Sequence, residues 1–273
     1  MSGDMNSRVI PTGESEIRNL TRTDQFEILY GCPLGQQSEC TGRQFHDMTD
    51  RPDPRRLRVA TSRRAPRPLP VIVLADVSGS MLPNQLEDKI GVLNRCIASM
   101  FTAFAQMDSV QGQVHVGAIA FGRAEARLHL PVGPAAEAVW PAMEAGGGTP
   151  MGAAFDLARE ILDDPEAVSG RAFEPALILV SDGVPTDDWE PALNELLGHR
   201  LGGKAMRISV GIGTDRTPDA EEVLAQFSGP EYGVLRADQA SELPELFRWI
   251  TDTVTSTFRP GLAAPNLEDF DRA

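Results

Sequence analysis

Two uninterrupted apolar runs, residues 71–75 and 176–180, most constrain how this 273-residue chain can fold. Each run is short, rich in aliphatic residues and followed by a polar turn, which is typical of a buried strand. Apolar residues spaced three and four apart then extend over residues 90–104 and predict a helix with one buried face. Buried strands that alternate with amphipathic helices predict an α/β fold, with a mostly parallel sheet and helices on both of its faces.

The rest of the pattern continues this alternation. Residues 127–132 are expected to form an antiparallel edge strand, and Pro83 is acceptable in a first helical turn. The further strands are expected over residues 113–121, 207–212 and 233–235. The further helices are expected over residues 135–143, 151–162, 189–197, 218–227 and 243–258. These elements belong to one domain, 69–258.

The regions on either side of this domain differ from it. Residues 1–68 contain few apolar residues and no sustained period, and seven arginines lie among prolines between positions 51 and 67. We interpret 1–68 as a partly extended segment, either a solvated linker or a docking arm for an acidic surface. Its Cys32, Cys40 and His46 match no standard zinc spacing and lack a fourth ligand. Residues 259–273 form an acidic, Pro- and Ala-containing tail that we expect to fray.

The overall charge and the cysteine content exclude several classes of function. A formal net charge of -14 disfavours binding to nucleic acid or to anionic membranes, because both carry negative phosphates. Three cysteines are a poor basis for a disulfide framework and suit a reducing compartment. The polar N-terminus leads to no secretory signal, and no apolar run approaches the ~20 residues of a membrane span. We therefore expect a cytoplasmic protein.

Polar side chains follow the buried strands at three places. Asp76, Ser78 and Ser80 follow the first strand, Thr149 follows three glycines, and Asp182 follows the second apolar run. Each could be an ordinary helix cap, but in a parallel sheet the loops at the carboxyl ends of the strands gather at one edge. Carboxylate and hydroxyl oxygens are hard ligands that suit Mg²⁺, Mn²⁺ or Ca²⁺ better than zinc or copper.

In this order the five residues resemble the metal-ion-dependent adhesion site (MIDAS) of the von Willebrand factor A (vWA) family, with no substitution. The resemblance covers about residues 69–258 and implies a Rossmann-like fold. It also implies that Ser78, Ser80 and Thr149 ligate the ion directly, and that Asp76 and Asp182 do so directly or through water. Within the family, Gly-Gly-Gly-Thr-Pro-Met-Gly at 146–152 and Ser-Asp-Gly-Val-Pro-Thr-Asp-Asp-Trp at 181–189 are similar to TerY-type tellurite-resistance proteins.

A divalent ion held by only two formal negative charges stays electrophilic and can accept one more oxygen ligand. A carboxylate from a protein partner would supply that ligand. We expect the partner to contact residues beside the ligands, namely Gly79, Met81, Gly148, Pro150, Gly183 and Asp187. Asp187 has an alternative reading as a carboxylate at the N-terminus of a helix.

The leading hypothesis is therefore a non-enzymatic, metal-dependent adaptor in a bacterial stress-resistance or defence assembly. An accessory subunit of a AAA+ ATPase machine is the alternative. A metal-dependent hydrolase is disfavoured because no His or Glu accompanies the cluster as a general base. Nucleotide binding is disfavoured because the glycines at 211 and 213 lack a third partner in the right place. The sequence leaves the oligomeric state open.

Overall fold

The computed structural model describes residues 66–107, 112–214 and 217–256. The chain divides into two units, Met1–Arg63 and Arg64–Ala273, and every described residue belongs to the second. The predicted N-terminal extension up to residue 65 and the tail from residue 257 lie outside the described residues. So do Cys32, Cys40 and His46.

The second unit is built on a six-stranded sheet with the strand order β3-β2-β1-β4-β5-β6. The strands are β1 (Arg67–Asp76), β2 (Gly112–Gly122), β3 (Glu125–Pro134), β4 (Ala176–Ser181), β5 (Met206–Ile212) and β6 (Val234–Ala237). All neighbouring pairs are parallel except β2 and β3, which pair antiparallel at one edge. The predicted sheet and its antiparallel edge strand are confirmed.

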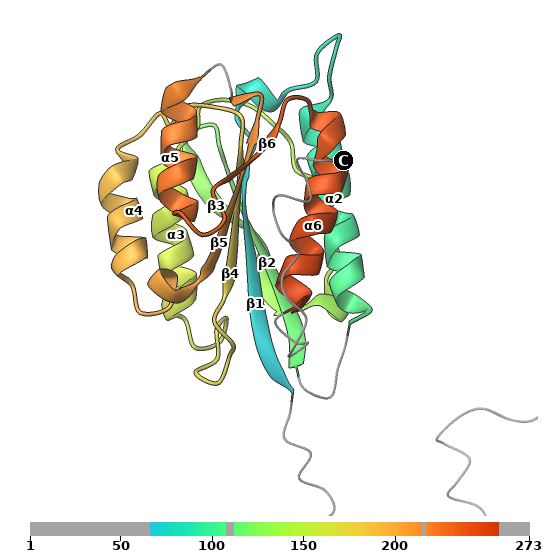
Figure 1. Cartoon of the computed structure of the whole chain (residues 1–273), viewed down its shortest axis with the longest axis vertical. Helices are drawn as coiled ribbons and strands as arrows, with labels where there is room; N and C mark the ends of the chain where they lie inside the picture. Colours follow the sequence, from blue (N-terminus) through green and yellow to red (C-terminus); the bar gives the residue numbers. More distant parts are fainter. Residues whose placement is uncertain (1–65, 108–111, 215–216, 257–273) are drawn as a thin grey trace, which may run out of the picture. The chain divides into compact units, whose positions relative to one another are not determined.

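Five α-helices cover the two faces of the sheet in the described residues (Figure 1). Helices α2 (Lys89–Ala105) and α6 (Leu243–Ser256) lie on one face. Helices α3 (Met151–Asp163), α4 (Trp189–Gly198) and α5 (Pro218–Ser228) lie on the other. Within the described ranges, no helix combines the length and the apolar character needed to cross a membrane.

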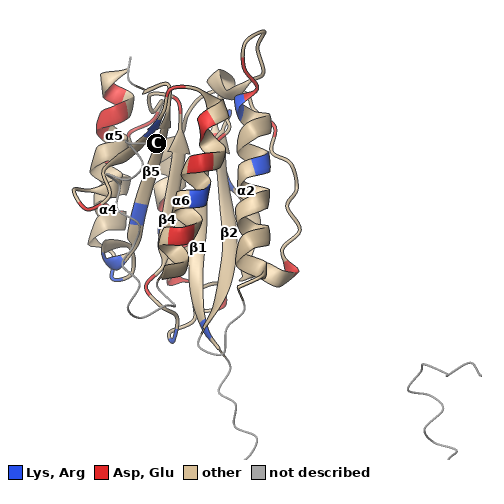
Figure 2. Ribbon diagram, turned by 45° about the vertical axis from the view of Figure 1, so that its right-hand side comes forward, with Lys and Arg blue, Asp and Glu red and all other residues tan. Residues whose placement is uncertain are grey.

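Coverage on both faces explains the two apolar runs. Strand β1 lies between β2 and β4, so side chains on both of its faces are buried from residue 68 onward. Charged residues occur in β1 only at its two ends, and β2 and β4 contain none. In Figure 2 these central strands are accordingly almost entirely tan, whereas acidic and basic residues are interspersed over helices and loops.

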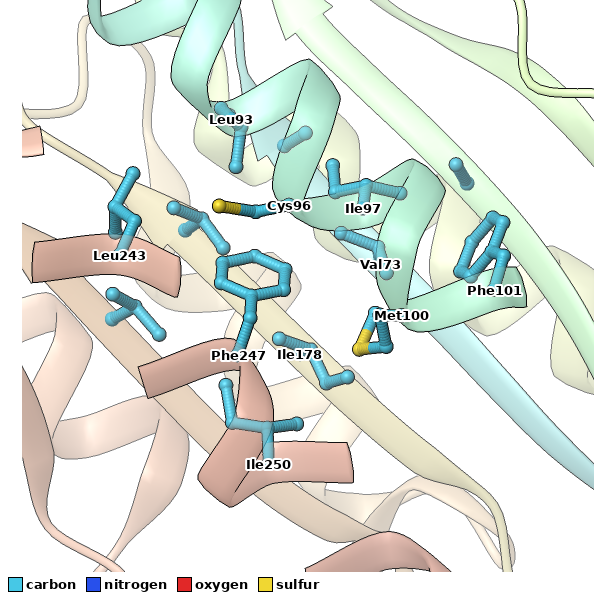
Figure 3. Packing of buried hydrophobic residues seen from close by; sticks show 14 of the residues in the cluster. Val73, Leu93, Cys96, Ile97, Met100, Phe101, Ile178, Leu243, Phe247 and Ile250 are labelled. Atoms are coloured by element: carbon cyan, nitrogen blue, oxygen red, sulfur yellow. The ribbon is translucent and has the colours of Figure 1, made fainter. Parts of the chain in front are cut away.

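The core on the α2 and α6 side is shown in Figure 3. The ring of Phe247 from α6 lies among Cys96 and Met100 of α2 and Ile178 of β4. Cys96 is a small buried hydrophobe, as predicted, and burial raises the pKa of its thiol to about 11. Burying a side chain such as Phe247 stabilises the fold by about 1.5–3 kcal/mol, and this contact fixes α6 against the sheet.

Two local predictions were wrong. Residues 135–143 form only a short 3-10 helix, η3 (Ala135–Glu137), followed by irregular chain. Pro141 lacks the N–H that a longer helix would need, and Asn94 of α2 holds this chain instead, accepting hydrogen bonds from Trp140 Nε1 at 3.1 Å and from Met143 N at 2.8 Å. Pro83 lies before α2 rather than in its first turn, because the helix begins at Lys89.

Candidate metal centre

Asp76 is the last residue of β1, and Ser181 is the last residue of the neighbouring strand β4. Because the two strands are parallel and adjacent, their carboxyl ends bring Asp76 next to the turn that contains Asp182. Ser181 Oγ donates a hydrogen bond of 2.5 Å to Asp76 Oδ2 across the two strands. The sheet itself therefore fixes one carboxylate of the candidate site.

The loop after β1 turns sharply around the same carboxylate. The backbone N–H of Ser78 donates to Asp76 Oδ1 at 2.7 Å, and the short 3-10 helix η2 (Gly79–Met81) follows. This local turn places Ser78 Oγ and Ser80 Oγ 2.9 Å apart. Ser80 Oγ then donates to Asp182 Oδ1 at 2.6 Å. The loops after β1 and β4 are thus joined through the side chains that the sequence singled out.

The glycine run before Thr149 packs between two other backbones. Gly79 N donates to Gly147 O at 2.8 Å, and Gly148 N donates to Arg123 O at 2.9 Å. Gly147 has a φ of +81°, and a Cβ there would lie 2.2 Å from Arg123 Cα. Only glycine fits this position, since another residue would clash with backbone and adopt a strained conformation. The close packing carries Thr149 to the loop after β1.

Thr149 Oγ1 lies beside the other site oxygens, around Gly183. An ideal Cβ on Gly183 would lie 3.5 Å from Thr149 Oγ1, 3.7 Å from Ser80 Oγ and 4.0 Å from Asp76 Oδ2. The position of Thr149 is fixed by Thr186, whose backbone N–H donates to Thr149 O at 2.9 Å. Three loops that are distant in the sequence therefore surround one small space with oxygen atoms.

This set of donors fits a hard divalent cation. It combines two carboxylates with three hydroxyls, and Asp76, Ser78, Thr149 and Asp182 are buried. In the described part of the chain, no group of three or more His, Cys, Asp and Glu side chains could hold a metal. An ion at this edge would therefore need hydroxyl oxygens and water in addition to the two carboxylates, and Mg²⁺ usually keeps several waters. The ligand roles of the five residues remain predictions.

The electrostatics of the site favour a nearby positive charge. Burial raises the pKa of Asp76 to about 6, although hydrogen bonds from Ser181 and Ser78 lower it and the charge of Asp182 adds to the rise. A carboxylate so far removed from water is costly to ionise unless a cation compensates it. The fold thus places an anion where a cation would be stabilising.

Two site residues were missed from the sequence. Ser181 supports Asp76 as described above, and Lys89 Nζ donates to Asp182 Oδ2 at 2.5 Å. The Lys89 side chain is 17% exposed and that of Asp182 is 0% exposed. The position of Lys89 could have indicated this pair. It is the first residue of α2, where the helix dipole disfavours a positive charge. A lysine at this position needs an anionic partner.

The carboxylate of Asp187 lies at the N-terminus of a helix, as in the alternative reading, but this helix is α3 and not α4, which follows Asp187 in the chain. Its Oδ1 accepts from Gly152 N at 3.1 Å and its Oδ2 accepts from Ala153 N at 3.0 Å. Both oxygens therefore accept hydrogen bonds from backbone N–H groups in the first turn of α3. They fix that helix, and the Thr149 loop before it, against the turn after β4.

The other residues expected to contact a partner fall into two groups. Gly79, Gly148 and Gly183 are half-buried at the surface of the site. Pro150 and Met81 are buried, and Met81 packs into the core beneath the loop. The side chain of Met81 would reach a partner only if this loop rearranged. Contact with a partner remains a prediction for all of these residues.

The fold is an α/β sheet with an oxygen-lined site at the carboxyl ends of β1 and β4. This arrangement is typical of ligand-binding domains in which the loops after the strands supply most of the binding residues. The sequence identifies the class further, because the von Willebrand factor type A domain family matches residues 71–249. This chain belongs to that family. Domains of the family are typically interaction modules, usually without catalytic activity, that bind protein ligands through a divalent cation at the MIDAS.

Solved structures agree on the fold. Proximal thread matrix protein 1 from the mussel byssus is 19% identical, with a TM-score of 0.52, over 68% of this chain and 48% of its own. This chain thus spans about half the length of the mussel protein. The vWF domain of the type V pili tip protein Mfa5 from Porphyromonas gingivalis is 12% identical, with a TM-score of 0.57, over 73% of this chain and 99% of its own.

A further structure of the mussel protein has a zinc-occupied MIDAS motif; it is 18% identical, with a TM-score of 0.50, over 69% of this chain and 48% of its own. None of the curated proteins is significantly similar in sequence to this chain. At sequence identities this low, the similarity supports the fold and nothing further. What any of these proteins binds is not carried over to this chain by the likeness.

Proposed function

We propose that this chain is a metal-dependent protein interaction module. In this proposal Mg²⁺, or Mn²⁺ or Ca²⁺ in its place, is held by Asp76, Ser78, Ser80, Thr149 and Asp182. A carboxylate of a protein partner completes its coordination. The observation that carries the proposal is the convergence of hydroxyl and carboxylate oxygens from three loops around Gly183.

The chemistry of this set supports a carboxylate as the partner's group. Two carboxylates balance a divalent ion without excess negative charge, so the ion keeps its attraction for another anion. Ser80 is the exposed member of the five residues, which identifies the side from which a partner would approach. A glutamate or aspartate on an exposed loop could reach the ion there.

Exposed apolar side chains on the loops that carry the site favour a protein partner over a small anion. Among the described residues, five large hydrophobic side chains are exposed, and three of them lie on the loops that carry Ser80 and Asp182. These are Leu82, Leu86 and Val184, and Leu86 is 97% exposed. Large exposed apolar side chains on the loops of a binding site are available to contact a protein partner. We define these three residues as the apolar rim.

The surroundings of the two carboxylates support a role without catalysis. In the described residues, their side-chain hydrogen bonds come from three serines and one lysine, none of which is a free general base. These are Ser78, Ser80, Ser181 and Lys89. As a biological setting we propose a cytoplasmic bacterial stress-resistance assembly. The glycine–threonine and Ser-Asp-Gly motifs, which resemble those of TerY-type proteins, support this setting.

Calorimetric titration of the full chain with Mg²⁺ tests the metal site. We expect binding to weaken about tenfold in Ser80→Ala, the loss of one oxygen ligand, and to remain unchanged in Ser99→Ala, an exposed serine on α2. Capture of a partner from the native cell extract should be lost with EDTA and in Ser80→Ala. Absence of Mg²⁺, Mn²⁺ and Ca²⁺ binding by the unmodified chain would refute the proposal.

A further inference from the structure

The lysine at the start of α2 is placed where a free ammonium is unfavourable. Its Nζ lies 2.5 Å from Asp182 Oδ2, and the Asp182 side chain has no exposed surface. The neighbouring carboxylate of Asp88 does not serve this lysine, since its Oδ1 accepts from Gly91 N at 2.9 Å and its Oδ2 lies 3.9 Å from Arg95 Nη1. Asp182 is therefore the carboxylate that compensates Lys89.

The two oxygens of Asp182 have different roles. Oδ1 accepts from Ser80 Oγ, on the side where the hydroxyls of the site gather, whereas Oδ2 accepts from Lys89. A divalent ion bound by Asp182, directly or through water, and an ammonium on the same carboxylate are like charges within a few ångströms. In a buried setting such charges repel strongly. The two cations therefore compete for Asp182.

We propose that Lys89 is an internal cation of the candidate metal site, whose ammonium competes with the divalent ion for Asp182 and so sets the affinity of the site for metal. Binding of the ion weakens the Lys89–Asp182 pair and moves the ammonium toward solvent. This inference rests on the proposed metal-binding function. It adds a residue that the five ligands do not include, and it gives that residue a measurable effect.

Metal affinity is the first measurement. The full chain is titrated with Mg²⁺ by calorimetry as the unmodified protein, as Lys89→Met, which keeps the length without the charge, and as Lys89→Arg, which keeps the charge. We expect Lys89→Met to bind Mg²⁺ about tenfold more tightly, the equivalent of one charge-assisted hydrogen bond, and Lys89→Arg to stay near the unmodified value. Lys204→Met, on an exposed lysine far along the chain, controls for net charge.

Amine reactivity is the second measurement, and the sequence makes it selective because the chain contains only two lysines, Lys89 and Lys204. Acetic anhydride labelling followed by mass spectrometry gives the ratio of their reactivities within one molecule. We expect this ratio to rise severalfold in Mg²⁺ relative to EDTA, as Lys89 leaves Asp182. Asp182→Asn should give a high ratio in both conditions.

The outcomes separate the two proposals. If Mg²⁺ binds but Lys89→Met leaves the affinity unchanged or weaker, Lys89 is not a competing cation, and the metal site stands without it. An unchanged labelling ratio in the presence of bound Mg²⁺ would overturn the inference in the same way. If no divalent ion binds to the unmodified chain, both proposals fail together. Thermal unfolding in EDTA verifies that each variant is folded.

Discussion

Adding one methyl group at Gly183 should separate metal binding from folding. Outside its two chain neighbours, the atoms nearest to a Cβ built at this position are the site oxygens of Thr149, Ser80 and Asp76, at 3.5, 3.7 and 4.0 Å. These are ordinary van der Waals distances, and Gly183 is not among the glycines with a positive φ. Gly183→Ala should therefore fold without strain and gain about 0.4–1 kcal/mol of stability from the reduced freedom of the unfolded chain.

Metal binding should change in the opposite direction. A magnesium ion lies about 2.0–2.1 Å from each ligand oxygen and retains several waters, so it needs the space that the methyl group would occupy among these oxygens. We expect the affinity for Mg²⁺ to fall at least about tenfold, which corresponds to about 1.4 kcal/mol. Calorimetric titration gives the affinity, and urea unfolding in EDTA gives the stability.

The matched control is Gly170→Ala, because a Cβ at Gly170 would meet no atom within 4 Å. This variant should bind Mg²⁺ like the unmodified chain. A folded Gly183→Ala protein with unchanged Mg²⁺ affinity would show that the ion does not lie among these three oxygens. A Gly183→Ala protein that loses stability would show instead that the space beside Gly183 is filled by packing.

Four further predictions concern the core and the loops of the domain. Gly147→Ala should lower the free energy of unfolding in urea by at least about 2 kcal/mol, from the strain at its positive φ and the clash with backbone, and an unaffected midpoint would contradict the packing of the glycine loop. Phe247→Ala should lower the free energy of unfolding by about 3–5 kcal/mol in the same assay. Leu86→Ala changes an exposed residue, so the free energy of unfolding should stay within about 0.5 kcal/mol, but capture of the partner should weaken. Cys96 should resist iodoacetamide at pH 8 in the folded protein, because a thiol with a pKa of about 11 is almost wholly protonated there, and mass spectrometry should find it alkylated only after unfolding.

Elements with a strong local pattern could be predicted from the sequence. The apolar runs of β1 and β4 and the spaced apolar face of α2 each depend on residues that are close in the chain. Residues 135–143 were predicted incorrectly for two reasons. Pro141 opposes a longer helix and was a signal in the sequence itself. Asn94, which lies more than forty residues earlier, holds Trp140 and Met143 in irregular chain. A tertiary hydrogen bond of this kind leaves no periodic signal in the sequence.

The same distinction applies to the candidate site. Asp76 and Asp182 could be identified because each closely follows an apolar run, and the adjacency of β1 and β4 then brings their loops together. The Lys89–Asp182 pair joins positions 93 residues apart, and only the unfavourable place of a lysine at a helix N-terminus pointed to it. The need for glycine at position 147 likewise arises from a backbone contact with Arg123, from a different loop.

The charges of the site connect the metal to the choice of partner. With both buried carboxylates ionised and Lys89 as an ammonium, the three side chains would carry one net negative charge, which repels an incoming carboxylate. In the proposed site, a bound divalent ion would reverse the sign and give one positive charge on loops that also expose Leu82, Leu86 and Val184. In the proposed competition, Lys89 would keep its charge on leaving Asp182, so the excess positive charge would stay near the site. The proposed ion therefore does more than bridge two proteins, since it converts this edge from one that excludes an acidic partner into one that attracts it.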